Sequence, residues 1–171
     1  MEVGALVADS RPVASFEDFV RTTAGPMHRT AVLLCGDHHL AEDLTQACYA
    51  KVFASWRRVA SADDPVAYAR KVLVRTFLSH RRLRRSSERP VEAVPDAAGA
   101  ADDPHVRLDL LAALRSLSTE DRAVLVLRFW EDLGSADAAR LLGITDAACR
   151  QRTARALARI RALMPDLEED R

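Results

Sequence analysis

Two stretches of closely spaced arginines carry the side chains in this sequence best suited to bind an anion. Residues 140–161 contain six arginines and a single acid, and residues 67–86 contain seven Lys or Arg side chains and no acid. Guanidinium groups bind phosphate oxygens and the edges of bases, so both stretches are candidate nucleic-acid contacts. The net charge of the whole chain is zero. Local patches of charge govern such contacts more than the total does.

The second of these stretches belongs to a helix-turn-helix pattern over residues 134–161. The pattern predicts a short helix, a turn at Gly143 and a longer helix capped by Thr145 or Asp146. Successive residues of a helix are about 100° apart, which places Cys149, Thr153, Ala156, Leu157, Ile160 and Met164 on one buried stripe. The exposed side would enter the major groove of DNA. The residues expected to contact DNA there are Ala147, Ala148, Arg150, Gln151, Arg152, Arg155 and Arg159. The alternative is a solvated, arginine-rich helix of an ordinary bundle.

The elements that must position these arginines are helices, because the periodicity shows no strand pattern and the composition is rich in Ala and Leu. Ser15, Asp64 and Ser118 are expected N-caps. The sequence predicts helices over about 15–34 (with a break or kink at Gly25-Pro26), 38–59, 65–85, 104–117 and 118–130, before the helix-turn-helix. Residues 87–103 contain acids, prolines and alanines, which is typical of a flexible linker. We therefore expect an all-α chain of two small helical domains, residues 15–86 and 104–165.

Composition and spacing argue against several other classes of protein. Three scattered cysteines do not make a disulfide framework, and no apolar run approaches a membrane span or a signal peptide, so a cytoplasmic protein without membrane insertion is expected. Cys35, His38 and His39 are spaced like metal ligands but lack an evident fourth partner. No nucleophilic triad, phosphate loop or carboxylate pair stands out. We expect no catalytic residue, metal or cofactor.

Two further features lie in the first half of the chain. Asp43, Gln46 and Ala50 share a helix face beside an apolar stripe, which suits docking on another protein or, equally, an ordinary solvated face. The helix over 65–85 has only positive charges, which favours an anionic partner such as nucleic-acid phosphate. A membrane surface is less well matched, because the helix lacks a large exposed apolar side.

Four segments in order resemble the bacterial RNA polymerase sigma factors of the extracytoplasmic-function (ECF) group, in the sigma-70 family. Residues 41–49 (AEDLTQACY) are similar to region 2.2, and residues 64–79 (DPVAYARKVLVRTFLS) to regions 2.3 and 2.4. Residues 117–133 (LSTEDRAVLVLRFWEDL) are similar to region 4.1, and the helix-turn-helix to region 4.2. The resemblance covers about residues 15–163.

The resemblance implies a transcription initiation factor that performs no covalent chemistry of its own. Its partners would be core RNA polymerase (the β′ clamp helices and the β flap), promoter DNA and, where one exists, an anti-sigma factor. The helix-turn-helix would bind the −35 element, and the loop 60–67 would hold a base flipped from the melted −10 strand. The implied −10 contacts are Asp64, Tyr68, Lys71, Arg75, Arg81 and Arg82, and the implied polymerase contacts are Asp43, Gln46 and Ala50.

The chain departs from the family pattern at Arg75, where many relatives have Asn, and at His80, where many have Trp. Residues 145–152 (TDAACRQR) also replace the usual start of the recognition helix. These departures imply an altered promoter preference or weaker binding to the −35 element. Two alternatives remain: a free-standing helix-turn-helix regulator that binds duplex DNA without polymerase, and a small helical metalloenzyme built around Cys35, His38 and His39.

Overall fold

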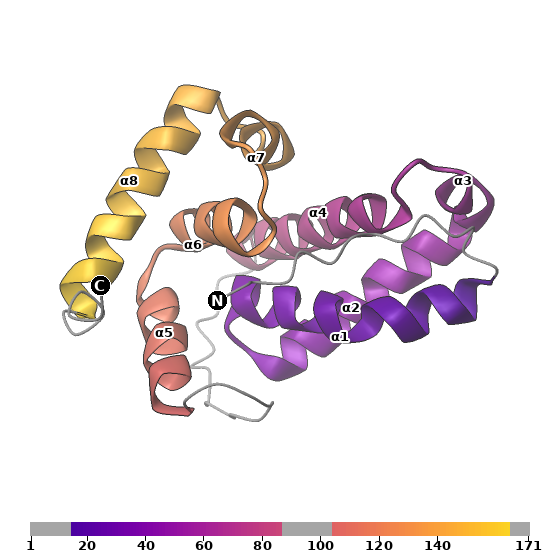
Figure 1. The fold of residues 1–171 in the computed structure, drawn as a ribbon, viewed down its shortest axis with the longest axis horizontal. Helices are drawn as coiled ribbons and strands as arrows, with labels where there is room; N and C mark the ends of the chain where they lie inside the picture. Colours follow the sequence, from indigo (N-terminus) through magenta and orange to yellow (C-terminus); the bar gives the residue numbers. More distant parts are fainter. Residues whose placement is uncertain (1–14, 87–103, 165–171) are drawn as a thin grey trace, which may run out of the picture.

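The computed structural model describes residues 15–86 and 104–164, with the side chains of 84–86 and 104–109 outside the description. Every regular element in these two ranges is a helix, which confirms the predicted all-α fold (Figure 1). Residues 1–14, the predicted linker 87–103 and residues 165–171 lie outside the described part. The elements in chain order are α1 (Phe16–Cys35), α2 (His38–Ala54), α3 (Trp56–Ala60), α4 (Pro65–Ser86), α5 (Pro104–Ser116), α6 (Thr119–Leu125), the π-helix η1 (Val126–Trp130), α7 (Ser135–Leu142) and α8 (Asp146–Leu163).

Side-chain caps begin most of the longer helices where the sequence places them. The Ser15 hydroxyl accepts a hydrogen bond from the Asp18 amide at 3.1 Å, and the Asp64 carboxylate accepts one from the Ala67 amide at 2.8 Å. Ser118 caps α6 in the same way. Each cap satisfies an amide that has no carbonyl partner within its helix. The predicted starts of α1, α4 and α6 are therefore confirmed.

Two of the predicted helices differ from the observed ones. Helix α1 runs without interruption through Gly25 and Pro26, so the expected break there is wrong. The predicted helix over 38–59 is in fact two helices, α2 and α3, separated by Ser55. The Ser55 carbonyl accepts hydrogen bonds from the amides of Arg58 and Val59 and so starts a new helix. The rings of Phe16 and Trp56, whose centroids are 5.3 Å apart, pack together beside this junction.

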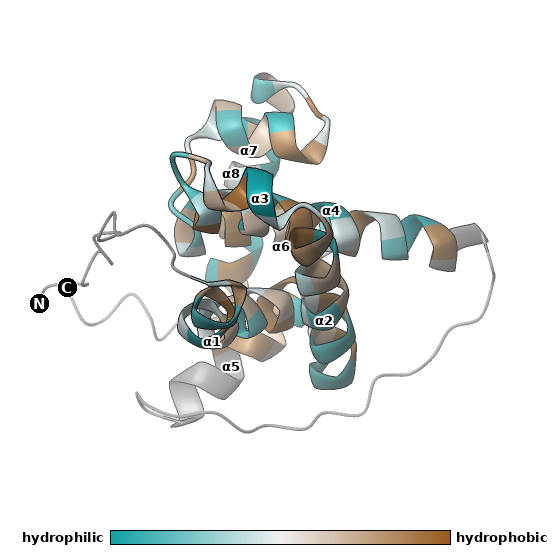
Figure 2. Ribbon diagram, turned by 90° about the vertical axis from the view of Figure 1, so that its right-hand side faces the viewer, coloured by the Kyte–Doolittle hydropathy of each residue, from teal (hydrophilic) through white to brown (hydrophobic). Residues whose placement is uncertain are grey.

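The two helical units, α1–α4 and α5–α8, pack against each other. Helix α6 contacts α1 on one side and α8 on the other (Figure 1). One continuous hydrophobic core joins fully buried residues of both units, such as Leu34 and Leu73 with Val124 and Leu127. Figure 2 shows the apolar part of α6 at the centre of the molecule. A second core, with Leu114 and Ile160, lies within the α5–α8 unit. No helix in the described ranges is long and apolar enough to span a bilayer.

Candidate nucleic-acid interface

Helix α8 presents the side that the sequence predicts for DNA contact. Gly143 ends α7 in the left-handed conformation at φ 68°, and the Thr145 hydroxyl caps α8 by accepting a hydrogen bond from the Ala148 amide at 3.1 Å. Of the two predicted caps, Thr145 is the one used. On the inner stripe Cys149, Ala156 and Ile160 are buried, whereas Thr153, Leu157 and Met164 are partly buried. This geometry exposes the opposite side of the helix to solvent.

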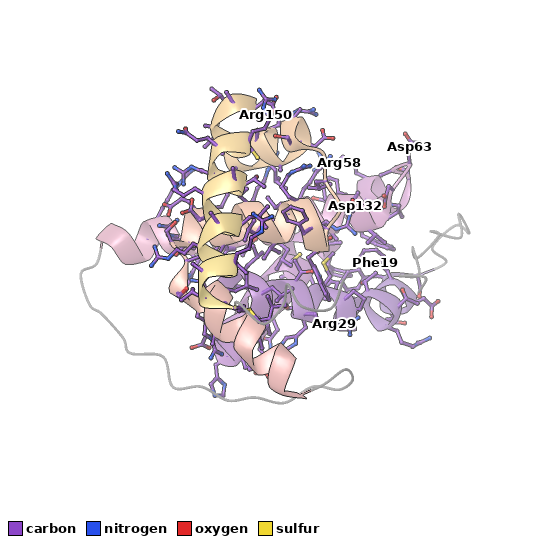
Figure 3. All side chains as sticks on the ribbon, turned by 60° about the vertical axis from the view of Figure 1, so that its left-hand side comes forward. Phe19, Arg29, Arg58, Asp63, Asp132 and Arg150 are labelled. Atoms are coloured by element: carbon purple, nitrogen blue, oxygen red, sulfur yellow. The ribbon has the colours of Figure 1, made fainter. Side chains whose placement is uncertain are left out.

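The predicted −35 residues differ in their freedom to reach a ligand. Ala147, Gln151 and Arg159 are exposed, and Ala148 is half-buried. Arg150 is exposed and pairs with Asp146 on its own helix, at the outer end of α8 in Figure 3. This pairing does not prevent contact with phosphate, because exposed ion pairs within one helix are weak.

Arg155 and Arg152 share one carboxylate on α6. Arg155 donates a hydrogen bond to Asp121 at 2.9 Å, and a nitrogen of Arg152 lies 3.8 Å from the same oxygen. The hydrogen bond from Arg155 to Asp121, together with the attraction between their charges, raises the pKa of Arg155. Asp121 itself is buried, so α8 is tied to the domain core at this point. The side chain of Arg155 remains 60% exposed and can still reach a ligand.

Helix α4 divides its basic residues between two faces. Counting 100° per residue from Lys71, Arg75 and Arg82 fall within about 40°, whereas Arg81 lies about 80° away on the other side. Lys71, Arg75 and Arg82 are exposed. Arg81 is turned toward the second unit and pairs with Glu120 on α6 at 2.6 Å. The sequence does not reveal this pairing, because Glu120 is distant in the chain.

The first turn of α4 brings Asp64 and Tyr68 beside an arginine that the sequence analysis missed. Arg58 of α3 donates a hydrogen bond to the Tyr68 hydroxyl at 3.1 Å, and its guanidinium carbon lies 6.0 Å from the centroid of the tyrosine ring. Figure 3 shows Arg58 and Asp63 in this part of the molecule, away from Arg150. The Asp64 carboxylate is occupied as the cap of α4.

An open hollow of about 560 Å³ lies next to this turn and is lined by residues 53–58. The Phe53 ring, 63% exposed, and Trp56 supply apolar surface, and Arg57 and Arg58 supply positive charge. Aromatic rings beside arginines form a surface on which unpaired bases can stack. The sequence signal for this hollow is the run Trp56-Arg57-Arg58, which interrupts the polar side of a predicted helix.

The predicted polymerase contacts lie together on α2. Asp43, Gln46 and Ala50 are all exposed, whereas Leu44 and Cys48 of the same helix are buried. The structure thus presents the three residues as one polar strip beside the packed face.

The candidate metal ligands near the start of α2 do not form a site. Among the described residues, no group of three or more His, Cys, Asp or Glu side chains is placed to hold a metal ion. The Cys35 thiol instead donates a hydrogen bond to the Asp37 carbonyl at 3.1 Å. Burial raises the pKa of Cys35 to about 11, so its thiolate form is disfavoured.

Comparison with known families divides the chain as the helices do. Residues 19–87 match the family described as Sigma-70 region 2, and residues 107–160 match Sigma-70, region 4. The RNA polymerase sigma-E factor of Streptomyces antibioticus is 34% identical over 151 residues, which cover 87% of this chain and 84% of that protein. The corresponding factor of Streptomyces coelicolor is 32% identical with similar coverage. The ECF RNA polymerase sigma factor SigE of Mycolicibacterium smegmatis is 30% identical over 90% of this chain and 63% of its own length.

Solved structures share the fold. The sigma factor RpoE from Bartonella quintana, in complex with the anti-sigma factor NepR, superposes with a TM-score of 0.73 and 24% identity, covering 91% of this chain and 98% of that one. CnrH, in complex with the cytosolic domain of CnrY, gives a TM-score of 0.57 at 19% identity over 90% of this chain and 89% of that one. With two family regions in the same order and relatives matched over most of their length, this chain belongs to the sigma-70 family of RNA polymerase sigma factors, in its extracytoplasmic-function group.

Proposed function

We propose that this chain, a promoter-directing transcription initiation factor, recognises its promoters with two separate helices. Helix α8 binds the −35 element as a duplex, and helix α4 with the preceding loop binds the melted −10 strand. The observation that carries the proposal is the pair of exposed basic faces, one in each family region, on elements whose opposite sides are packed into the cores. Bond formation in RNA belongs to the polymerase.

At the −35 element, sequence is recognised by Gln151 and Arg155, whose long polar side chains reach base edges. Arg150, Arg152 and Arg159 bind phosphates and fix the position of α8 in the groove. The small side chains of Ala147 and Ala148 allow the helix to lie close to the bases. The −35 site is thus shorter in hydroxyl donors and richer in guanidinium groups than the usual family pattern.

At the −10 element, Lys71, Arg75 and Arg82 bind the backbone of the separated strand along one face of α4. Asp64 holds the first turn of α4 in place, and Tyr68 lies beside it. The hollow lined by residues 53–58 accepts an unstacked base, because it offers aromatic surface next to positive charge. Arg81 joins the DNA contacts once it is released from Glu120.

Core RNA polymerase docks on the α2 strip of Asp43, Gln46 and Ala50, and its β flap meets the α5–α8 unit. The domains are residues 15–86 and 104–165, with 87–103 as the linker. The titles of the RpoE and CnrH structures name an anti-sigma factor and a partner's cytosolic domain, and an anti-sigma partner for this chain is part of the proposal. The chain acts in the cytoplasm, where polymerase and chromosome are found.

The proposal is tested by reconstituting the chain with core polymerase and selecting promoters from a genomic library. We expect co-elution at low salt and transcripts from a defined promoter class. Arg155→Ala should weaken binding of the selected −35 duplex about 5- to 150-fold, the range for loss of one good base contact, and leave a scrambled duplex little affected. Core polymerase should bind the variant as well as it binds the natural chain.

Two controls separate base recognition from the tie between α6 and α8. Asp121→Asn weakens the hold on Arg155 but keeps the arginine, so discrimination between the two duplexes should persist. Arg161→Ala removes an exposed arginine from the same helix and should weaken both duplexes slightly and equally. Failure to co-elute would refute the function. Equal loss of the two duplexes in Arg155→Ala would refute the base contact.

A further inference from the structure

A buried polar cluster joins the two helical units. We define the Glu131 cluster as Thr30 of α1, Arg70 of α4, and Trp130 and Glu131 at the end of η1. Arg70 forms an ion pair with Glu131, whose side chain is only 7% exposed. The buried Thr30 hydroxyl donates a hydrogen bond to Glu131 and accepts one from the Trp130 indole at 3.1 Å. Hydrogen-bonded charges of this kind are costly to leave without a partner.

The end of α1 makes a second polar junction between the units. Its last turn has no basic residue of its own, and Gly36 ends it in the left-handed conformation at φ 74°. Arg115 of α5 donates a hydrogen bond to the Gly36 carbonyl at 3.0 Å, and the buried Arg122 of α6 lies against the same glycine. A helix C-terminus carries partial negative charge, so the second unit supplies the cations that α1 lacks. Gly36 leaves room for them, since a Cβ there would lie 2.7 Å from Arg122.

The same packing occupies a residue assigned above to DNA. Arg81 pairs with Glu120, so a carboxylate of the second unit sits where the proposed −10 phosphate would bind. Helix α6 thereby covers one side of α4. The α2 strip of Asp43, Gln46 and Ala50 stays exposed in this arrangement, so polymerase can dock without prior separation of the units.

The arrangement is too compact for two-part promoter recognition. Elements centred near −35 and −10 are about 25 base pairs apart, or about 85 Å at 3.4 Å per base pair. Units held within hydrogen-bond distance of each other cannot bind both elements at once. Residues 87–103, fully extended, would span up to about 60 Å, which permits separation when the dimensions of the two units are added.

We propose that the free chain holds itself in a closed state, through the Glu131 cluster and the arginines at the end of α1, which is unable to bind a promoter until core polymerase separates the two units. The proposal rests on the proposed function for the identity of the DNA surfaces. The closed state itself is a property of the free chain. Opening exchanges contacts between the units for contacts with polymerase and DNA, and Arg81 is released in the same step.

The test measures the distance between the units in the full-length chain by single-molecule energy transfer. Dyes are attached to cysteines placed at two exposed alanines, Ala54→Cys on α2 and Ala162→Cys on α8. The natural pair should show high transfer alone and low transfer after addition of core polymerase. Glu131→Gln should raise the low-transfer fraction of the free chain about tenfold, since the loss of one partner of a largely buried pair is discounted for the partial exposure of Arg70.

A matched control removes a carboxylate that makes no contact between the units. Asp137→Asn breaks an exposed pair with Arg140 inside α7 and should leave the transfer unchanged. Circular dichroism checks that each variant keeps its helices. Should Glu131→Gln lose helix, the exchange of charges provides the test. Arg70→Glu should open the chain, and Arg70→Glu with Glu131→Arg should close it again.

Low transfer in the natural free chain, or identical transfer in Glu131→Gln and Asp137→Asn, would overturn the proposal. So would failure of the charge exchange to restore the closed state. Polymerase binding is scored on the same samples by co-elution. Loss of that binding in a chain that is closed when free would refute the proposed function and leave the closed state established.

Discussion

Replacing Gly143 with alanine tests the turn that sets the angle between α7 and α8. The residue has φ 68° and ψ 34°, and a Cβ there would meet nothing within 4 Å. The cost therefore comes from the backbone alone. The left-handed conformation costs a residue with a Cβ about 1–2 kcal/mol, and the stiffer unfolded chain returns about 0.4–1 kcal/mol. We expect Gly143→Ala to lower the free energy of unfolding by about 1 kcal/mol.

The matched control is a glycine in ordinary helical geometry. Gly25 is exposed within α1, and a Cβ there would meet only the flexible end of Arg29 at 3.4 Å. Gly25→Ala should raise the free energy of unfolding by about 0.5–1 kcal/mol, as expected inside a helix. Urea denaturation followed by circular dichroism measures both changes, and Gly143→Asn should cost less than Gly143→Ala. A stabilising Gly143→Ala would refute the assigned turn, and effects of the same sign at both glycines would refute the reasoning.

Three further outcomes follow from the described contacts. Lys71→Gln should weaken binding of the −10 single strand and reduce the slope of log affinity against log salt concentration by about 0.7, in a titration by fluorescence anisotropy; an unchanged slope would remove Lys71 from the phosphate contacts. Asp64→Ala should cost about 0.5–2 kcal/mol of unfolding free energy through loss of the cap on α4, whereas Asp64→Asn should cost little, and equal losses would argue that charge rather than capping matters. Burial raises the pKa of Cys48 to about 12 and that of Cys35 to about 11, so at pH 8 both thiols hold less thiolate than a free thiol and should react with a disulfide reagent far more slowly in the folded chain than in urea; equally fast reaction in both states would contradict the packing around them.

The faces of α8 could be predicted from the sequence because they depend on local periodicity. A helix whose apolar residues repeat at 3.6-residue spacing has only one way to bury them, and the stripe from Cys149 to Ile160 follows it. Caps were predictable for a similar reason. Ser15, Asp64 and Ser118 act on amides two or three residues away, so a short window of sequence contains both partners.

The errors lie where tertiary packing outweighs local preference. Pro26 lies inside α1 without ending it, and the helix beyond it is held by buried residues such as Met27 and Leu34. Ser55 ends α2 although the apolar spacing continues past it. Neither outcome is visible in a local pattern, because each depends on what packs against the helix.

The contacts between the two units were beyond prediction from one sequence. Glu131 and Glu120 looked like ordinary surface acids, and Arg70 like one more positive charge on α4. Their pairing joins residues that are far apart in the chain and separated by the acidic segment 87–103. The candidate DNA residues could therefore be named from sequence, whereas the restraint on Arg81 could not.

The π-helix η1 makes this protein sensitive to a change of length by one residue. The Glu131 amide bonds to the Val126 carbonyl five residues back, and the wide turn closes with a hydrogen bond from the Leu133 amide to the Leu127 carbonyl. Such a turn accommodates one residue more than an α-helix of the same rise. Deleting a single residue from 126–130 would allow a regular α-helix, but it would rotate Glu131 by about 100° away from Thr30 and Arg70. Family members that differ here by one insertion or deletion would thus differ in how tightly their two halves associate, with no change in the residues that face DNA.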